Sequence, residues 1–469
     1  MRIDENLKVV VNDVKFWIIL FFLIRLLGIT NAPLETAHNW RQTTVAMVAR
    51  NFFEVDNNIL YPRIDIAGEK TGITGMEFPV LNYLIYLFSK VFGYSHWYGR
   101  LINLIVSSFG LFFFYKIVLK YFDKRIAFNA AIILLFSIWF SYSRKIMPDT
   151  FATSLIIIGV YYGSNFLEKS NFFSLLLYII FIALGTLSKL PAAYLLVIFV
   201  VFFGSNKINI QLKVIFFFAT ITSLLLPTVW YFYWVPYLVD QFGFWHFFMG
   251  KNILIGLQEI INSLPNTLKR FYDDALKYIG FSIFIFGLIK MIGKQNKLLL
   301  TIFCLSFFSF LIVVFKAGFT FSHHTYYIIP FVPVMALVCG FGIYKIKNIK
   351  IRALVLISIC LEGILNQQHD FRINKNELAL LQLENDLNKV SEKKDLILIN
   401  SGEYPTPMYF AHRKGWVNSN DQINDKNYVN QLNEKGLKYI VILKKTFEKN
   451  INLNYRVVFD SENYSIYKL

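Results

Sequence analysis

The sequence predicts an α-helical polytopic membrane protein of about eleven spans, with a small C-terminal α/β domain outside the membrane. Hydrophobic residues make up 56% of its 469 residues, charged residues only 16%, and phenylalanine alone occurs 49 times. A soluble protein of this size has no need for so much apolar surface. The apolar residues form long runs as far as about Leu365, and the composition becomes more polar after that point.

Runs of about 18 apolar residues are typical of membrane-spanning helices. The eleven candidates lie near residues 15–30, 101–119, 126–143, 151–167, 172–188, 190–204, 213–235, 278–292, 298–315, 326–344 and 352–365. Arg25 interrupts the first run, and no small-x-small cleavage site follows it. We therefore expect the first run to be a membrane anchor and not a cleaved signal peptide.

Basic residues in the short connectors predict the orientation. They form four clusters: Lys120, Lys124 and Arg125; Lys207 and Lys213; Lys290, Lys294 and Lys297; Lys345, Lys347, Lys350 and Arg352. With the N-terminus inside, all four fall on the cytoplasmic side, as the positive-inside rule requires. This count depends on segment 79–93, which is short and contains Asn82 and Lys90, so we expect an interfacial or re-entrant helix there. The net charge of +17 thus reflects membrane topology, and we expect no nucleic-acid partner.

The same count predicts that the unusual polar residues share the extracytoplasmic face of the cytoplasmic membrane. That face receives the long first loop (31–100), residues 144–150, Lys189, residues 236–272, residues 316–327 and the chain after about 366. Ionisable residues at span ends in a mostly apolar protein point to function. Loops far apart in sequence would together build a site at the membrane surface.

The last hundred residues predict a separate fold. Residues 378–390 have helical spacing, and 395–400, 437–443, 456–459 and 465–467 have the patterns of strands. We predict a membrane domain of residues 1–368, which includes the outer loop 31–100, and an extracytoplasmic α/β domain of residues 369–469.

The first loop opens with a dense polar segment, His38-Asn39-Trp40-Arg41-Gln42. Arginine presents a planar fork that suits phosphate, so we expect this segment to bind an anionic group. The alternative is that Arg41 and Trp40 only anchor the first span at the interface.

Two carboxylates precede predicted helices on the same face. Glu77 comes just before Pro79, and Asp149 follows Pro148. Both are candidates for chemistry, and the alternative for each is a residue that only favours or caps a helix start.

Further candidates on this face are Arg144, Lys145, Lys189, His323, His324, Tyr326 and Tyr327. Lys189 could instead only extend its side chain to the interface, and the tyrosines could be interfacial aromatic residues. Adjacent histidines rarely face the same point, so this pair alone does not predict a metal site. A divalent metal ion is compatible with the sequence but not required by it.

This layout resembles the GT-C superfamily of integral-membrane glycosyltransferases, within it the protein O-mannosyltransferases and bacterial aminoarabinose transferases (glycosyltransferase family 39-like). The matching segments are Ala49-Arg50, Glu77-Phe78-Pro79-Val80-Leu81, Gly93 through Arg100-Leu101, Arg144 through Asp149, His324 through Pro330, and Tyr409 through Trp416. One departure concerns the acidic pair that the family carries in the first loop. That pair falls on Arg41-Gln42 here, as in a subgroup with His-x-Trp-Arg-Gln, which leaves Asp149, Glu77 and Glu35 as candidate catalytic carboxylates.

The resemblance implies transfer of a sugar from a polyprenyl-phosphate donor, of the undecaprenyl type, to a glycolipid, polysaccharide or protein acceptor. The donor's leaving group is anionic and needs cations and hydrogen-bond donors more than a general acid. The candidate phosphate-binding residues are His38, Arg41, Gln42, Arg144, Lys145, Lys189, His323, His324, Tyr326 and Tyr327. A transporter or flippase of polyprenyl-linked glycans is the alternative, but it should carry polar residues near the bilayer midplane and broken helices in repeated positions.

Overall fold

The computed structural model describes residues 10–244, 250–293, 296–447, 451 and 453–469. These residues form two compact units. The helical unit comprises the described parts of Met1–Ile29, Arg100–Tyr231 and Phe248–Gln368, and the α/β unit comprises those of Thr30–Gly99, Phe232–Phe247 and His369–Leu469. Lys294 of the third basic cluster and the first nine residues lie outside the described part of the chain.

Each apolar run of the sequence contains helix. The helices are α2 (Val14–Leu26), α5 (Tyr98–Tyr121), α6 (Lys124–Phe136), α7 (Trp139–Tyr142), α8 (Pro148–Lys169), α9 (Phe172–Ser188), η1 (Leu190–Phe199), α10 (Val200–Phe203), α11 (Ile210–Val229), η2 (Trp230–Trp234), α15 (Lys277–Gly293), α16 (Lys297–Ala317), η4 (Thr325–Phe331), α18 (Val332–Lys345) and α19 (Ile349–Gln367). Between them lie the shorter helices α13 (Ile253–Asn262), α14 (Leu264–Lys269), η3 (Arg270–Ala275) and α17 (Phe319–His323).

Five of the described helical segments are long and apolar enough to cross a membrane. They are Tyr98–Tyr121, Pro148–Lys169, Ile210–Phe242, Lys297–Ala317 and Thr325–Lys345, and a pair bent by 97° (Leu264–Ala275 with Lys277–Gly293) would make a sixth. The other apolar helices are shorter, so the figure of eleven spans stays a prediction. The fold class is confirmed: the protein is a polytopic helical membrane protein with a C-terminal sheet.

Asparagine and aspartate side chains fix where many of these helices begin. Asp13, Asp123, Asn171, Asn209 and Asn348 each accept a hydrogen bond from a backbone N–H in the first turn of the helix that follows. Such N-caps satisfy donors that the helix itself cannot pair. All five precede helices that the predicted topology starts on the cytoplasmic side.

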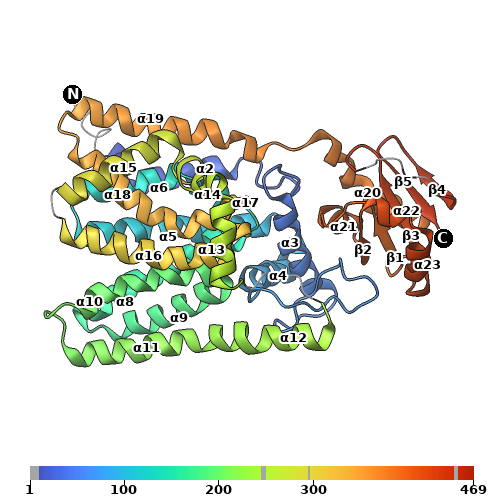
Figure 1. Ribbon diagram of the computed structural model, residues 1–469, viewed down its shortest axis with the longest axis horizontal. Helices are drawn as coiled ribbons and strands as arrows, with labels where there is room; N and C mark the ends of the chain where they lie inside the picture. Colours follow the sequence, from blue (N-terminus) through green and yellow to red (C-terminus); the bar gives the residue numbers. More distant parts are fainter. Residues whose placement is uncertain (1–9, 245–249, 294–295, 448–450, 452) are drawn as a thin grey trace. The chain divides into compact units, whose positions relative to one another are not determined.

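Helix α18 forms the centre of the helical unit, packed on α6 and α15 (Figure 1). Small residues allow this close packing: a Cβ at Gly340 of α18 would lie 2.7 Å from the backbone nitrogen of Ala130 in α6. Without a hydrophobic driving force between helices in lipid, such close backbone contact is a main source of association.

The α/β unit contains a five-stranded sheet of order β2-β1-β3-β5-β4 (Figure 1). Its strands are β1 (Leu396–Ile399), β2 (Gly415–Val417), β3 (Leu437–Leu443), β4 (Arg456–Asp460) and β5 (Tyr464–Lys468). Strand β1 pairs in parallel with β2 and β3, whereas β5 pairs antiparallel with β3 and β4. The four expected strands are confirmed, and β2 was not predicted because its three residues show no alternation.

The helices of this unit lie before, between and after the strands. They are α3 (Asn39–Glu54), α4 (Val80–Phe92), α12 (Val235–Phe242), η5 (Gln368–Phe371), η6 (Lys375–Gln382), α20 (Leu383–Val390), α21 (Thr406–Ala411), α22 (Asn420–Asn424) and α23 (Lys426–Glu434). The helix expected at 378–390 occurs as η6 and α20. Segment 79–93 forms α4, whose 13 residues are too few to span a bilayer, as expected for an interfacial helix.

The compact units group Thr30–Gly99 with His369–Leu469. The sequence, by contrast, predicts a membrane domain that includes the loop. The backbone explains the grouping, because Thr36 N donates to Arg372 O at 2.8 Å and Gly415 N donates to Asp65 O at 3.0 Å. The boundary that the sequence predicts at residue 368, between a membrane domain and an extracytoplasmic domain, stays a prediction.

Candidate active site

The first-loop cluster consists of Glu35, Arg41, Gln42 and Glu77 in the α/β unit. Helix α3 starts after His38, whose left-handed backbone (φ 58°) turns the chain into the helix and places Arg41 and Gln42 in its first turn. Arg41 forms an ion pair with Glu77, and Gln42 Nε2 donates to Glu35 Oε2 at 3.3 Å. All four side chains are buried.

This geometry argues against a purely interfacial role for Arg41. An anchor residue keeps its charge in water or among headgroups, whereas Arg41 is buried against a carboxylate. Glu77 lies just ahead of α4, as the sequence predicts, and its carboxylate pairs with Arg41. Removing one partner of such a buried pair leaves an uncompensated charge and costs roughly 3–5 kcal/mol.

The span-end cluster consists of Asp149, Lys189, Tyr326 and Tyr327 in the helical unit. Asp149 lies in the first turn of α8 and is 2% exposed, but the N-cap position belongs to Met147, so Asp149 is not the cap. Its Oδ1 lies 3.6 Å from Nζ of Lys189, which is 5% exposed at the end of α9. Lys189 is therefore not a lysine that extends into solvent.

Two tyrosine rings also lie near Lys189. Its Nζ lies 5.6 Å from the ring centre of Tyr326 and 5.5 Å from that of Tyr327, within the range of cation–π attraction. His324 stacks on Tyr326 with 5.4 Å between ring centres. The structure thus brings four of the predicted phosphate-binding residues, Lys189, His324, Tyr326 and Tyr327, into one group, and Lys189 connects this group to the Asp149 carboxylate.

Arg144 and Lys145 lie on the turn that leads into α8. Arg144 donates to the carbonyls of Leu27 (2.6 Å) and Gly28 (3.1 Å), at the end of the first span. Lys145 is buried, with its Nζ 5.5 Å from the ring centre of Tyr142. The turn thereby ties α8 to the end of α2.

The two adjacent histidines have different environments. The His323 ring is exposed, stacks on Phe319, and its Nδ1 lies 2.8 Å from Ser322 Oγ. The His324 ring instead stacks on Tyr326, as described above. In the described part of the chain, no group of three or more His, Cys, Asp and Glu side chains could hold a metal ion.

Comparisons with known proteins extend this picture. Residues 77–234 match the family model described as dolichyl-phosphate-mannose-protein mannosyltransferase. No curated protein matches the sequence. Among solved structures, ArnT from Cupriavidus metallidurans bound to undecaprenyl phosphate matches with a TM-score of 0.61 at 12% identity, over 96% of this chain and 98% of that one.

An oligosaccharyltransferase from Archaeoglobus fulgidus matches with a TM-score of 0.55 at 12% identity, over 91% of this chain and 69% of that one. The chain has the GT-C fold. The resemblance drawn from the sequence is confirmed by these matches.

Sequence reasoning missed a buried asparagine in the helical unit. Asn103 of α5 donates from Nδ2 to the carbonyls of Tyr142 (3.0 Å) and Lys145 (2.8 Å), and its Oδ1 accepts from Thr150 Oγ1 (3.1 Å). It thus fixes the turn that precedes Asp149. The sequence did offer a signal, because Asn103 is a lone asparagine within an apolar run. A polar side chain there needs hydrogen-bond partners inside the membrane.

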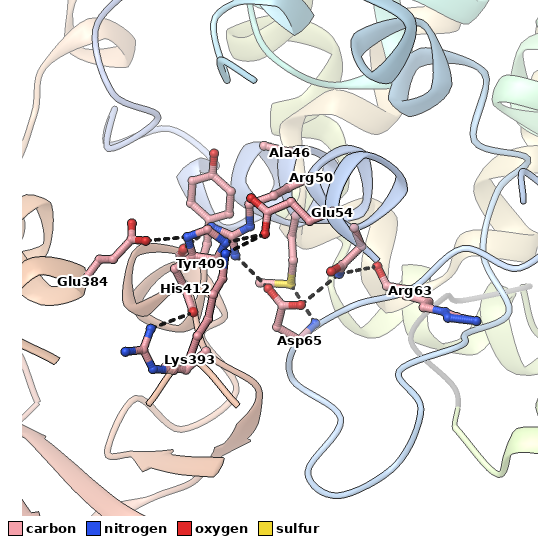
Figure 2. A network of polar contacts seen from close by, with 12 residues as sticks. Ala46, Arg50, Glu54, Arg63, Asp65, Glu384, Lys393, Tyr409 and His412 are labelled. Atoms are coloured by element: carbon pink, nitrogen blue, oxygen red, sulfur yellow. Dashed lines mark hydrogen bonds and ion pairs between the residues drawn. The ribbon is translucent and has the colours of Figure 1, made fainter. Parts of the chain in front are cut away.

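Sequence reasoning also missed the contacts that hold the far end of α3. Figure 2 shows Arg50, which donates to Asp65 Oδ2 at 2.7 Å and to Tyr409 O at 2.9 Å. The same figure shows His412, whose Nε2 lies 2.7 Å from Glu54 Oε2 and whose Nδ1 lies 2.6 Å from Glu384 Oε1.

The start of α3 is held by C-terminal residues as well. Asn39 Nδ2 donates to Glu377 Oε2 at 2.7 Å, and Thr43 Oγ1 lies 3.1 Å from Thr406 Oγ1. Residues after 369 therefore fix the helix that carries Arg41 and Gln42. The Ala49-Arg50 and Tyr409-to-Trp416 motifs, which the sequence offers separately, meet at the far end of α3, where Arg50 donates to Tyr409 O.

Proposed function

We propose that this protein is a glycosyltransferase that moves a sugar from a polyprenyl-phosphate-linked donor to an acceptor at the outer face of the cytoplasmic membrane. The observation that carries the proposal is a buried carboxylate, Asp149, paired with Lys189, which itself lies beside two tyrosine rings in a GT-C fold. The match of residues 77–234 to a mannosyltransferase family model supports the same reaction class.

Asp149 is the residue we assign as general base. Its carboxylate accepts the proton of the acceptor hydroxyl while the acceptor oxygen bonds to the anomeric carbon of the sugar. The bond from that carbon to the phosphate oxygen breaks, and polyprenyl phosphate leaves as an anion. The helix N-terminus beneath Asp149 and the neighbouring Lys189 offset the negative charge of this carboxylate.

Cations and hydrogen-bond donors stabilise the leaving phosphate. In the helical unit we assign this role to Lys189, Lys145, Arg144, His324 and the two tyrosines. In the first loop, Arg41, Gln42 and His38 stay candidates from the sequence for binding an anionic group, and Glu77 and Glu35 position Arg41 and Gln42 by the contacts described above. Each charge-assisted contact to phosphate contributes roughly 1.5–3 kcal/mol.

The related structures support the donor class. ArnT was solved with undecaprenyl phosphate, and the archaeal oligosaccharyltransferase was solved with a tethered acceptor peptide. We propose an undecaprenyl-phosphate type of donor carrying a hexose or pentose, and a glycolipid, polysaccharide or protein as acceptor. The positive-inside pattern supports an active site and a C-terminal domain on the extracytoplasmic side.

The test uses purified full-length protein and a panel of radiolabelled undecaprenyl-phosphate sugars with envelope extract as acceptor. We expect label to move to glycolipid, polysaccharide or protein with at least one donor, and the Asp149→Asn variant to lose transfer. If no donor gives transfer but the protein moves lipid-linked glycan across vesicle membranes, the flippase alternative replaces the proposal.

A further inference from the structure

A pocket lies in the helical unit where α6 and α19 begin. Its volume is about 540 Å³, within the size range of small-molecule sites. Its walls are formed by Asn12, Lys124, Arg125, Phe128, Asn129, Ile349, Arg352, Ala353 and Leu356. None of these residues belongs to the catalytic assignment above.

The charge of this pocket is positive. Lys124, Arg125 and Arg352 line it, and no carboxylate does. In the ranges that the structure describes, none of these three side chains forms an ion pair or a hydrogen bond. The neighbouring Asp123 is committed to the backbone, where it caps α6 by accepting from Arg125 N at 2.8 Å. The N-termini of α6 and α19 add to the positive potential.

A buried amide faces the same pocket. Asn129 is 6% exposed and lines the pocket, and its Nδ2 has no hydrogen-bond partner in the described part of the chain. Buried donors in folded proteins nearly always have an acceptor. Three cations and one unsatisfied donor around a single pocket therefore indicate an anionic ligand with hydrogen-bond-accepting oxygens.

The remaining wall is apolar. Phe128, Ile349, Ala353 and Leu356 complete the pocket, and the last three lie on one face of α19 with Arg352. Outside the pocket, α19 exposes Leu354, Ile357 and Leu361, as a lipid-facing helix does. A ligand that fits both walls has an anionic head and apolar chains.

We propose that this pocket binds the phosphate headgroup of an anionic phospholipid, such as phosphatidylglycerol, whose acyl chains lie along α19. Basic pockets between membrane helices recognise anionic lipid headgroups in this way. A free phosphate ion would contact the cations but would leave the apolar wall with no part of the ligand packed against it. The site is separate from the proposed donor site and does not depend on the proposed activity.

The experiment measures lipid retention by native mass spectrometry of the full-length protein in neutral detergent. We expect phosphatidylglycerol to stay bound and phosphatidylcholine to be lost. The Arg125→Gln/Arg352→Gln variant should bind phosphatidylglycerol roughly 25-fold more weakly, about fivefold for each charge. The matched control, Lys207→Gln/Lys290→Gln, removes the same charge away from the pocket and should bind as the parent does.

Asn129→Leu gives a second, independent measurement. It removes the buried donor with little change in size, so the protein should fold as stably as the parent in phosphatidylcholine. We expect it to lose the rise in melting temperature that phosphatidylglycerol gives the parent.

Three results would overturn the proposal. The first is unchanged retention after Arg125→Gln/Arg352→Gln, and the second is equal loss in the control. The third is stabilisation of lipid-free protein by millimolar inorganic phosphate as strong as that by phosphatidylglycerol, which would assign the pocket to a soluble anion.

Discussion

Lys189 Nζ lies 3.6 Å from Asp149 Oδ1, and both side chains are buried in the helical unit. The two residues are separated by an entire pair of helices in sequence, because α8 starts at Pro148 and α9 ends at Ser188. The hairpin of these helices returns the lysine to the start of α8. Two residues that lie at separate span ends in the sequence thereby form a charge pair in the structure.

Asp149→Asn should abolish transfer while the protein still folds, although its melting temperature should fall because Lys189 loses its carboxylate partner. The amide keeps the shape of the side chain but cannot accept a proton, and loss of a general base typically lowers the rate by about 10²–10⁴. Radiolabel transfer and a thermal melt of the same preparation measure both quantities. Activity within a fewfold of the parent would remove Asp149 from the role of base.

Lys189→Met should lower stability because it leaves Asp149 as a buried carboxylate without its cation. The cost of breaking such a pair is roughly 3–5 kcal/mol. The double variant Asp149→Asn/Lys189→Met should recover most of the melting temperature and remain inactive. Additive effects in this double-mutant cycle would show that the two side chains do not interact.

Substitutions of Arg41 should separate the contribution of its charge from that of its planar guanidinium group. Arg41→Lys keeps the charge but loses the planar fork, so it should reduce transfer by at least about tenfold while costing less stability than Arg41→Ala. Purified variants compared by transfer rate and melting temperature check this. Full activity in Arg41→Lys would assign the residue a role as a point charge only.

The contact between His412 and α3 should weaken as the pH rises. Burial disfavours the charged ring, but hydrogen bonds to Glu384 and Glu54 outweigh it and raise the pKa of His412. The positive charge of Arg50 acts to lower the pKa of His412, whereas Lys393 forms an ion pair with Glu54. Stabilisation by the charged ring is therefore complete below the unfolded pKa of about 6.5 and is lost as the pH rises through the folded value.

Glu54 determines how the same contact weakens at low pH. Burial opposes its charge, but His412 and Lys393 prevail and lower the pKa of Glu54 to about 2. Its contribution is present above the unfolded pKa, about 4.3, and is lost as the pH falls toward 2. Melting temperatures of the parent and of His412→Gln should differ most between about pH 4.5 and 6.5 and converge above this range. A constant difference at every pH would contradict the charged contact.

Gly340→Ala should destabilise the helical unit. The added Cβ would lie 2.7 Å from the backbone nitrogen of Ala130, and backbone atoms cannot move aside as a flexible side chain can. Overpacking of this kind costs about 1–3 kcal/mol. Gly293→Ala is the matched control, since its Cβ would meet no atom within 4 Å. A melting temperature for Gly340→Ala equal to that of the control would show that the helices can separate without cost.

Much of the fold could be predicted from local patterns. Apolar runs, connector charges and strand alternation depend only on residues close in sequence, so the helices, the sheet and the short α4 follow from them. Strand β2 could not be predicted, because its three residues are extended only by pairing with β1. The grouping of α3 with the C-terminal sheet was equally hidden, since Arg50 and Tyr409 are far apart in the chain.

Local sequence patterns were enough to predict the membrane class, the small C-terminal α/β fold, the GT-C resemblance and the residue types available for chemistry. The pairing of distant residues became visible only in three dimensions: Asp149 with Lys189, Arg41 with Glu77, and His412 with both Glu54 and Glu384. This is because composition and periodicity specify each element's apolar face, whereas ion pairs form between side chains that packing brings together from distant positions.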